Sequence, residues 1–395
     1  FPRLTSLLCT LAMSLSLVPA VSAASQPEPL ISTNRYGYYN GNWAVPRSSY
    51  LYQDGQDLVR VEYRKGSQLV NGQTGQFLEW LTPTTLVVET YDSHFQLKET
   101  RELEVELPIW GGFFAGEDYN FVVFGQENPS ESDSAEVVRV VKYSKSWERL
   151  DQASLRGANT TIPFDAGGFT CAEDGGLLYI RTSHEMYTSS DGLNHQASLS
   201  FTVRQEDMTI SDAASAVSNP ATGYVSHSFN QLMLVDQEGR LVALDHGDAY
   251  PRGASLYRCD GQSGRRGTQL LVASWPGSIG ANVTGAQVTG LAETSTGYLT
   301  AYSYTGKGAS SNLTADVKNI YLAYTSKDDF SQSGTRTRQI TSYANGGNIY
   351  GSQPVLVPTS LEDGYIIWSM AEKADNGYYY NTDSIGYARY SAEGS

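Results

Sequence analysis

Four of the chain's five histidines fall within residues 184–246, and imidazole is the side chain best suited to proton transfer and metal binding near neutral pH. They are His184, His195, His227 and His246. Imidazole nitrogens together with carboxylates can bind a divalent ion such as zinc, manganese or iron, so these four are candidate metal ligands. No H-x-H or H-E-x-x-H motif occurs among them. A second interpretation therefore stays open, in which they bind loop carbonyls at strand ends.

Polar side chains that could bind a ligand surround these histidines. They are Glu185, Asp191, Gln196, Asn230, Gln231, Asp245, Asp248, Tyr250 and Arg252. In the stretch "DHGDAYPRG", Asp248 and Arg252 are close enough to form a turn ion pair, and Pro251 restricts the backbone between them. Alternatively, the Arg252 guanidinium could hold a carboxylate or sulfate in a bidentate pair. The carboxylates around Asp191 are too sparse for a D-x-D-x-D calcium loop.

A repeat of strands determines where these side chains lie. Six times, a strand-like run ends in a large residue followed by a polar turn, at Tyr91, Tyr143, Val203, Tyr257, Tyr324 and Tyr390. The intervals are 52, 60, 54, 67 and 66 residues, and an apolar hairpin precedes each turn. Such a repeat, with about four short strands in each unit, is typical of a β-propeller. We expect an all-β fold with six four-stranded blades, although seven would also fit.

The segmentation of the chain resembles that of secreted bacterial β-propeller repeat proteins. The stretches "YVSHSFNQ", "DHGDAYPRG" and "NHQ" are similar in character to family motifs, over most of residues 31–395. The resemblance implies a fold and a secreted setting, and no catalytic residue.

The propeller scheme places the histidines at one end of the molecule. The loops before strand A and between strands B and C of a blade open on the same face. The stretch "SHEMYTSSDGLNH" is predicted to be the B–C loop of unit three, and "DHGDAYPRG" that of unit four. The stretch "YVSHSFNQ" is predicted to begin strand A of unit four. His184, His195, His227 and His246 could then converge, whereas His94 falls on the opposite face.

The chain ends supply predictions of a different kind. Residues 1–23 read as a secretory signal peptide, with an apolar run and a small-residue cleavage site near Ala23. Residues 24–395 are predicted to form one propeller domain without membrane insertion, and the sequence could be truncated at either end. The last unit stops after its third strand. Either the segment "RYGYYNGNWAV" completes that blade, or the sequence is a fragment.

The overall composition limits the choice of partners. The formal net charge is −15, which disfavours binding of nucleic acid. The chain also contains 38 Gly and 27 Tyr residues, a composition typical of turns and strands in an all-β protein. Cys171 and Cys259 could form a disulfide in an oxidising compartment or remain separate buried thiols.

Three functions follow as hypotheses. The first is a secreted or cell-surface monomer that binds a glycan, peptide or surface polymer through its long B–C loops, with a glycan or polymer favoured over a protein. Loop tyrosines such as Tyr187, Tyr250 and the run 378–380 could stack on sugar rings. The second is a polysaccharide lyase or glycoside hydrolase, with a His, Asp and Arg cluster and a divalent metal as its cofactor. The third is an adhesion module without a small ligand.

Overall fold

The computed structural model describes residues 38–70, 77–80, 82–215, 228–249, 251–259, 267–278, 280–307, 316–344, 347–377 and 379–395. Within these ranges the regular structure consists of β-strands, without a helix. No helix in the described part of the chain is therefore long and apolar enough to cross a membrane.

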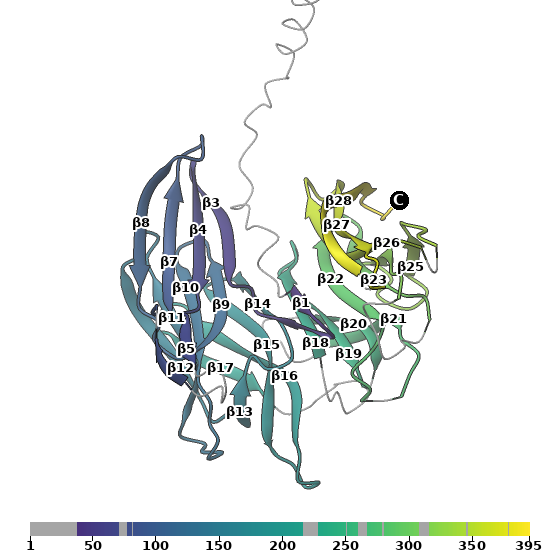
Figure 1. Ribbon diagram of the computed structural model, residues 1–395. Helices are drawn as coiled ribbons and strands as arrows, with labels where there is room; N and C mark the ends of the chain where they lie inside the picture. The colour runs from purple at the N-terminus through teal and green to yellow at the C-terminus, as the bar shows by residue number, and fades with distance from the viewer. Residues whose placement is uncertain are drawn as a thin grey trace, which may run out of the picture.

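Six antiparallel sheets form the blades of a β-propeller, as the repeat predicts (Figure 1). Blade 1 contains β3 (Ser49–Asp54), β4 (Asp57–Arg64), β7 (Thr85–Tyr91) and β8 (Leu97–Leu103). Blade 2 contains β9 (Ile109–Ala115), β10 (Asn120–Gly125), β11 (Glu136–Tyr143) and β12 (Arg149–Arg156). Blade 3 contains β13 (Thr160–Pro163), β14 (Phe169–Asp174), β15 (Leu177–Thr188), β16 (Asn194–Arg204) and β17 (Thr209–Ala214).

The second half of the chain supplies the other three blades. Blade 4 contains β18 (Ser228–Val235), β19 (Leu241–Asp248), β20 (Arg252–Cys259) and β21 (Gly267–Ser274). Blade 5 contains β22 (Ala286–Glu293), β23 (Gly297–Tyr304), β24 (Asn319–Ser326) and β25 (Thr335–Gln339). Blade 6 contains β26 (Ile349–Pro358), β27 (Asp363–Lys373) and β28 (Tyr379–Ser391). A small separate hairpin, β5 (Gln68–Val70) and β6 (Phe77–Trp80), comes between β4 and β7 in the sequence, although β4 and β7 pair directly.

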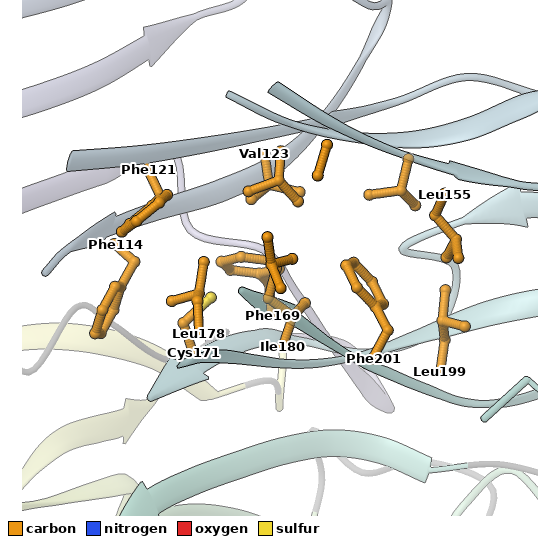
Figure 2. Close-up of a cluster of buried hydrophobic side chains, with 14 of the residues drawn as sticks. Phe114, Phe121, Val123, Leu155, Phe169, Cys171, Leu178, Ile180, Leu199 and Phe201 are labelled. Carbon is orange, nitrogen blue, oxygen red and sulfur yellow. The ribbon is translucent and has the colours of Figure 1, made fainter. Parts of the chain in front are cut away.

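Apolar side chains on facing sheets hold neighbouring blades together. Figure 2 shows the cluster between blades 2 and 3, where Phe114, Phe121, Val123 and Leu155 face Phe169, Cys171, Leu178, Ile180, Leu199 and Phe201. Similar clusters join blades 1 and 2, 4 and 5, and 5 and 6. Sheets between two neighbours therefore bury both of their faces, which a single blade could not do alone.

The contact between blades 3 and 4 is different because it contains polar groups. Its apolar cluster is small, with Ala172, Tyr179 and Met233 as the buried members. Beside it, Arg181 of β15 forms an ion pair with Asp245 of β19, and its Nε lies 3.0 Å from Asp245 Oδ1. A cation buried between blades requires such a partner.

Blade 6 has three strands in the described part of the chain, and residues 38–45 do not supply a fourth. Instead, β1 (Tyr38–Asn40) and β2 (Trp43–Val45) pair with each other. This hairpin packs on Phe229 of β18, among the inner strands of the ring (Figure 1). The prediction that "RYGYYNGNWAV" could complete blade 6 is therefore wrong for residues 38–45. Burial of Tyr39 and Ala44 favours the central position.

Cys171 and Cys259 are both buried, and they form no disulfide with each other. Cys171 faces blade 2, whereas Cys259 ends strand β20 in blade 4. Of the two alternatives left open by the sequence, the structure has the separate thiols.

Candidate functional site

The two predicted B–C loops are much shorter in the structure than in the sequence prediction. Strands β15 and β16 continue as a hairpin, with pairing from Leu177 opposite Arg204 to Thr188 opposite Asn194. Strands β19 and β20 likewise pair up to Asp248 opposite Arg252. His184, His195 and His246 therefore lie on strands, and the prediction that they occupy loops is wrong. His184 and His246 lie within strands because buried partners bond their side chains, whereas His195 pairs with the exposed Asp191.

His184 is fully buried on β15, in blade 3. Its Nδ1 lies 2.7 Å from the hydroxyl of Thr160 on β13. Burial lowers the pKa of His184 to about 4, against a smaller opposing effect of the Ser215 backbone. The imidazole is therefore neutral at neutral pH and connects two strands of one blade.

His195 is partly exposed and holds the tip of the same hairpin. Its Nε2 lies 2.8 Å from Asp191 Oδ2, and Asp191 Oδ1 accepts a hydrogen bond from the Leu193 amide at 3.0 Å. Both contacts, the Leu193 amide first, lower the pKa of Asp191. Gly192 has a φ of 80°, which favours glycine at this tip.

His246 is fully buried at the end of β19. Its Nδ1 contacts the Tyr39 hydroxyl, and its Nε2 lies 2.8 Å from Thr284 Oγ1. The Tyr39 hydroxyl also accepts a hydrogen bond from the Val288 amide at 3.1 Å. Burial, with a smaller effect of the Arg252 charge, lowers the pKa of His246 to about 3. This imidazole anchors the central hairpin and is not accessible to a ligand.

Arg252 binds backbone carbonyls of the segment that follows β21. Its Nη1 donates to Ala281 O at 2.7 Å and its Nη2 to Val283 O at 2.7 Å. Nη1 also lies 3.3 Å from Asp248 O. Burial lowers the pKa of Arg252 and the Asp248 charge opposes this. The guanidinium thus fixes a loop, which leaves little of it for a substrate carboxylate.

The remaining predicted site residues are distributed over several contacts. Gln196 Nε2 donates to Asp165 Oδ2 at 3.0 Å, and Glu185 Oε1 accepts from Thr161 Oγ1 at 2.7 Å. Asn230 and Gln231 are fully buried, and Asn230 Nδ2 donates to Val288 O at 2.9 Å. His227 and Tyr250 lie outside the described residues.

Three of the four proposed metal ligands therefore have separate partners: Thr160 for His184, Asp191 for His195, and Tyr39 with Thr284 for His246. Among the described residues, no group of three or more His, Cys, Asp or Glu is arranged to hold a metal ion.

The structure instead brings together two loops of neighbouring blades. The connection 126–135 of blade 2 lies against the tip of the β15–β16 hairpin of blade 3. Glu131 Oε1 accepts hydrogen bonds from the Thr188 amide at 2.8 Å and from the Thr188 hydroxyl at 2.6 Å. These two hydrogen bonds lower the pKa of Glu131, so its carboxylate is charged at neutral pH. We call residues 126–135 and 187–195 the blade 2–3 ridge.

Tyr187 of the hairpin forms two further hydrogen bonds to the loop 126–135. Its hydroxyl accepts from Asn128 Nδ2 at 3.2 Å and donates to Asp133 Oδ1 at 3.3 Å. Asn128 is buried, and its amide also donates to Ser132 O and Thr160 O, both at 3.1 Å. The stretch "GQENPSESDSAE" contains this connection, but the sequence analysis did not name Glu131 or Asp133 as site residues. Its length and its density of Ser, Asp and Glu were the available signal.

A small pocket lies between blades 3 and 4, beside the Arg181–Asp245 ion pair. Tyr179, Ser200, Thr202, Asp212 and Tyr257 line it with Arg181, and its volume is about 40 Å³. A site of that size accommodates water or a small group but no sugar ring.

Comparison with known proteins identifies no family. No family model matches the chain, and no curated protein matches it. Among solved structures, a protein of unknown function from Dyadobacter fermentans matches with a TM-score of 0.43 and 11% identity, over 92% of this chain and 97% of that one.

Two further matches have named activities. The GH43 protein of Bacillus licheniformis matches with a TM-score of 0.35 and 11% identity, over 92% of this chain and 54% of that one. A neuraminidase-like protein of A/little yellow-shouldered bat matches with a TM-score of 0.44 and 9% identity, over 90% and 99%. Likeness at this level carries no inference about function.

Proposed function

We propose that this protein is an extracytoplasmic binding propeller that recognises a neutral, hydroxyl-rich glycan at the blade 2–3 ridge. The observation that carries the proposal is the pair of hydrogen bonds from Thr188 to Glu131, which joins two loops into one preformed surface. A preformed surface loses less conformational entropy on binding than two independent loops would.

The chemistry of the ridge suits sugar hydroxyls. Asp133 and Asp191 are exposed, and carboxylates accept hydrogen bonds from hydroxyl groups. Tyr187 is half-buried and adds an aromatic surface between them. Together with Glu131 these groups give the ridge a negative charge. That charge repels an acidic polysaccharide, so a neutral glycan is favoured over a uronate polymer.

Binding is favoured over catalysis for a separate reason. A lyase or hydrolase needs an acid or base that reaches the substrate. His184 and His246 are buried and bonded inside the fold, and Arg252 is occupied by backbone carbonyls. These contacts support a structural role, and not a catalytic one, for His184, His246 and Arg252. The extracytoplasmic location is proposed from the predicted signal peptide at residues 1–23, which lie outside the described residues.

Affinity for immobilised neutral glycans tests the proposal. We expect Asp133→Ala to weaken binding about tenfold, since a hydrogen bond to a charged group contributes about 1.5–3 kcal/mol. The matched control is Asp118→Ala, an exposed aspartate of the same blade between β9 and β10, at the opposite end. Equal affinities of the two variants, or no binding to any neutral glycan, would refute the assignment. Release of reducing ends by the purified protein would instead support the hydrolase hypothesis.

A further inference from the structure

We propose that the contact between blades 3 and 4 is a hydrated, separable interface that opens as a unit while the neighbouring blades stay packed. Apolar clusters of 10 to 17 buried residues join blades 1 and 2, 2 and 3, 4 and 5, and 5 and 6. The cluster between blades 3 and 4 contains three buried residues. Because burial of apolar surface is the main force that holds packed sheets together, this contact is the weakest of these five.

Polar side chains cover both facing surfaces of this contact. Residues that lie directly opposite each other in a sheet have their side chains on the same face. The pairs on the facing surfaces are Thr170 with Arg181 and Ser183 with Ser198 in blade 3, and Gln231 with Asp245 and Tyr257 with Gln269 in blade 4. Each of these side chains carries a hydroxyl, an amide or a charge.

Six buried oxygens on these surfaces have no hydrogen-bond partner among the described residues. They are Thr170 Oγ1, Ser183 Oγ, Ser198 Oγ, Gln231 Oε1, Tyr257 Oη and Gln269 Oε1. Two of them, from opposite blades, meet at Gly167, where an added Cβ would lie 2.2 Å from Ser183 Oγ and 2.7 Å from Gln231 Oε1. Nearly all buried polar atoms in folded proteins bond to protein or to water. Water molecules between the blades are therefore the expected partners.

Hydration lowers the free energy needed to separate the two surfaces. Groups that already bond to water lose few hydrogen bonds when the blades part, and little apolar surface becomes exposed. The pocket of about 40 Å³ beside Arg181 is large enough for such water. The ion pair across the contact, in which Arg181 Nε lies 3.0 Å from Asp245 Oδ1, neutralises both charges in the closed form. Loss of one partner would leave a charge between the closed blades and therefore favour opening.

The blades on the two sides of this contact belong to separately packed units. Blade 3 packs on blade 2 and blade 2 on blade 1, whereas blade 4 packs on blade 5 and blade 5 on blade 6. The central hairpin is bonded to the second unit. The Tyr39 amide donates to Gln353 Oε1 of blade 6 at 3.1 Å, and the Tyr39 hydroxyl contacts His246 and the Val288 amide. Opening therefore moves blades 1–3 relative to blades 4–6 and disrupts neither unit.

The two buried cysteines lie in different contacts, so their thiols report on opening separately. Cys171 belongs to the apolar cluster between blades 2 and 3 (Figure 2). Cys259 lies directly opposite Leu241, which packs on the small cluster between blades 3 and 4. Burial raises the pKa of Tyr179 in blade 3, and the nearby Asp174 and Cys259 groups raise it further. Opening should therefore expose Cys259 and leave Cys171 buried.

The test measures how fast each cysteine of the full chain reacts during long exposure to a thiol reagent in dilute urea, followed by peptide mapping. Each rate is divided by the rate of the same cysteine in the unfolded chain. We expect the normalised rate of Cys259 to exceed that of Cys171 about tenfold or more, because unfolding of the whole chain exposes both thiols and opening exposes one. Equal normalised rates, or faster reaction of Cys171, would overturn the proposal.

Variants of the ion pair test whether this contact sets the rate. Asp245→Ala should raise the ratio of Cys259 to Cys171 labelling about tenfold, since it leaves Arg181 unpaired in the closed form. Arg181→Met/Asp245→Leu should return the ratio to within about threefold of the wild-type value, because apolar groups replace both charges. The matched control is Asp207→Ala, which breaks the exposed Arg204–Asp207 pair of blade 3 with the same change in net charge. Equal ratios in Asp245→Ala and Asp207→Ala would overturn the proposal, and the wild-type comparison decides it if Asp245→Ala does not fold.

This inference is independent of the proposed glycan binding. The blade 2–3 ridge lies within the first unit and does not include the contact between blades 3 and 4. Failure of the labelling test would leave the glycan proposal standing, and failure to bind glycans would leave the labelling prediction unchanged.

Discussion

The hydroxyl of Tyr39 contacts Nδ1 of His246 across 207 residues of sequence, and both side chains are buried. The contact fixes the hairpin β1–β2 to blade 4, while the Val288 amide ties the same hydroxyl to blade 5. One tyrosine therefore couples the N-terminal hairpin to two blades.

Tyr39→Phe should destabilise the protein by about 1–3 kcal/mol, because His246 Nδ1 and the Val288 amide would each lose a buried partner. Urea unfolding followed by tryptophan fluorescence measures the change. Tyr387→Phe serves as the control, since its ring is 70% exposed and its loss of a hydroxyl should change the free energy of unfolding by less than about 0.5 kcal/mol. Equal stabilities of the two variants would contradict a role for the Tyr39 hydroxyl.

Stability should fall as the pH decreases from about 6.5 toward 3. Burial lowers the pKa of His246 to about 3 and that of His184 to about 4, so the unfolded chain binds more protons than the folded protein in this range. Each imidazole should contribute a slope of up to about 1.4 kcal/mol per pH unit. His246→Gln should reduce the slope, measured as the urea midpoint against pH. His94→Gln, at an exposed position, should leave it unchanged; a slope insensitive to both changes would contradict the assignment.

The Arg181–Asp245 ion pair should behave as a buried pair between blades 3 and 4. The two side chains are 20% and 18% exposed. Asp245→Ala leaves the Arg181 guanidinium without its carboxylate and should cost about 2–4 kcal/mol of stability. The double variant Arg181→Met/Asp245→Leu should recover most of this loss. For comparison, Asp207→Ala breaks the exposed pair Arg204–Asp207 and should cost less than about 1 kcal/mol. A similar loss in both single variants would argue against burial as the cause.

Cys171 and Cys259 should resist thiol reagents in the folded protein and react once it is unfolded. Both are buried and form no disulfide, and burial raises the pKa of the Cys171 thiol, which keeps it protonated. Peptide mapping after labelling, with and without denaturant, measures each cysteine separately. Leu97→Cys, at a position 56% exposed, should label rapidly in the folded state and confirms that the reagent is active. Failure of both native cysteines to label under non-reducing denaturation would indicate a disulfide.

The propeller and its blade number could be predicted because they depend on local patterns. The apolar run that ends at Tyr143 is followed directly by the turn Ser144–Glu148, so residues close in sequence carry the whole signal. The same reasoning placed His184 and His246 in loops, because polar residues read as strand ends. In the structure Thr160 and Tyr39 each contact one ring nitrogen of these histidines, and the strands continue.

The sequence by itself determined the class of fold and the six repeats, since each unit contains an apolar hairpin followed by a large residue and a polar turn. Only the tertiary structure decided which distant groups meet. Tyr39 and His246, Glu131 and Thr188, and Arg181 and Asp245 become partners because the ring brings blades and hairpin together. The repeat identifies strands and turns, but it carries no information about the residue that will lie opposite.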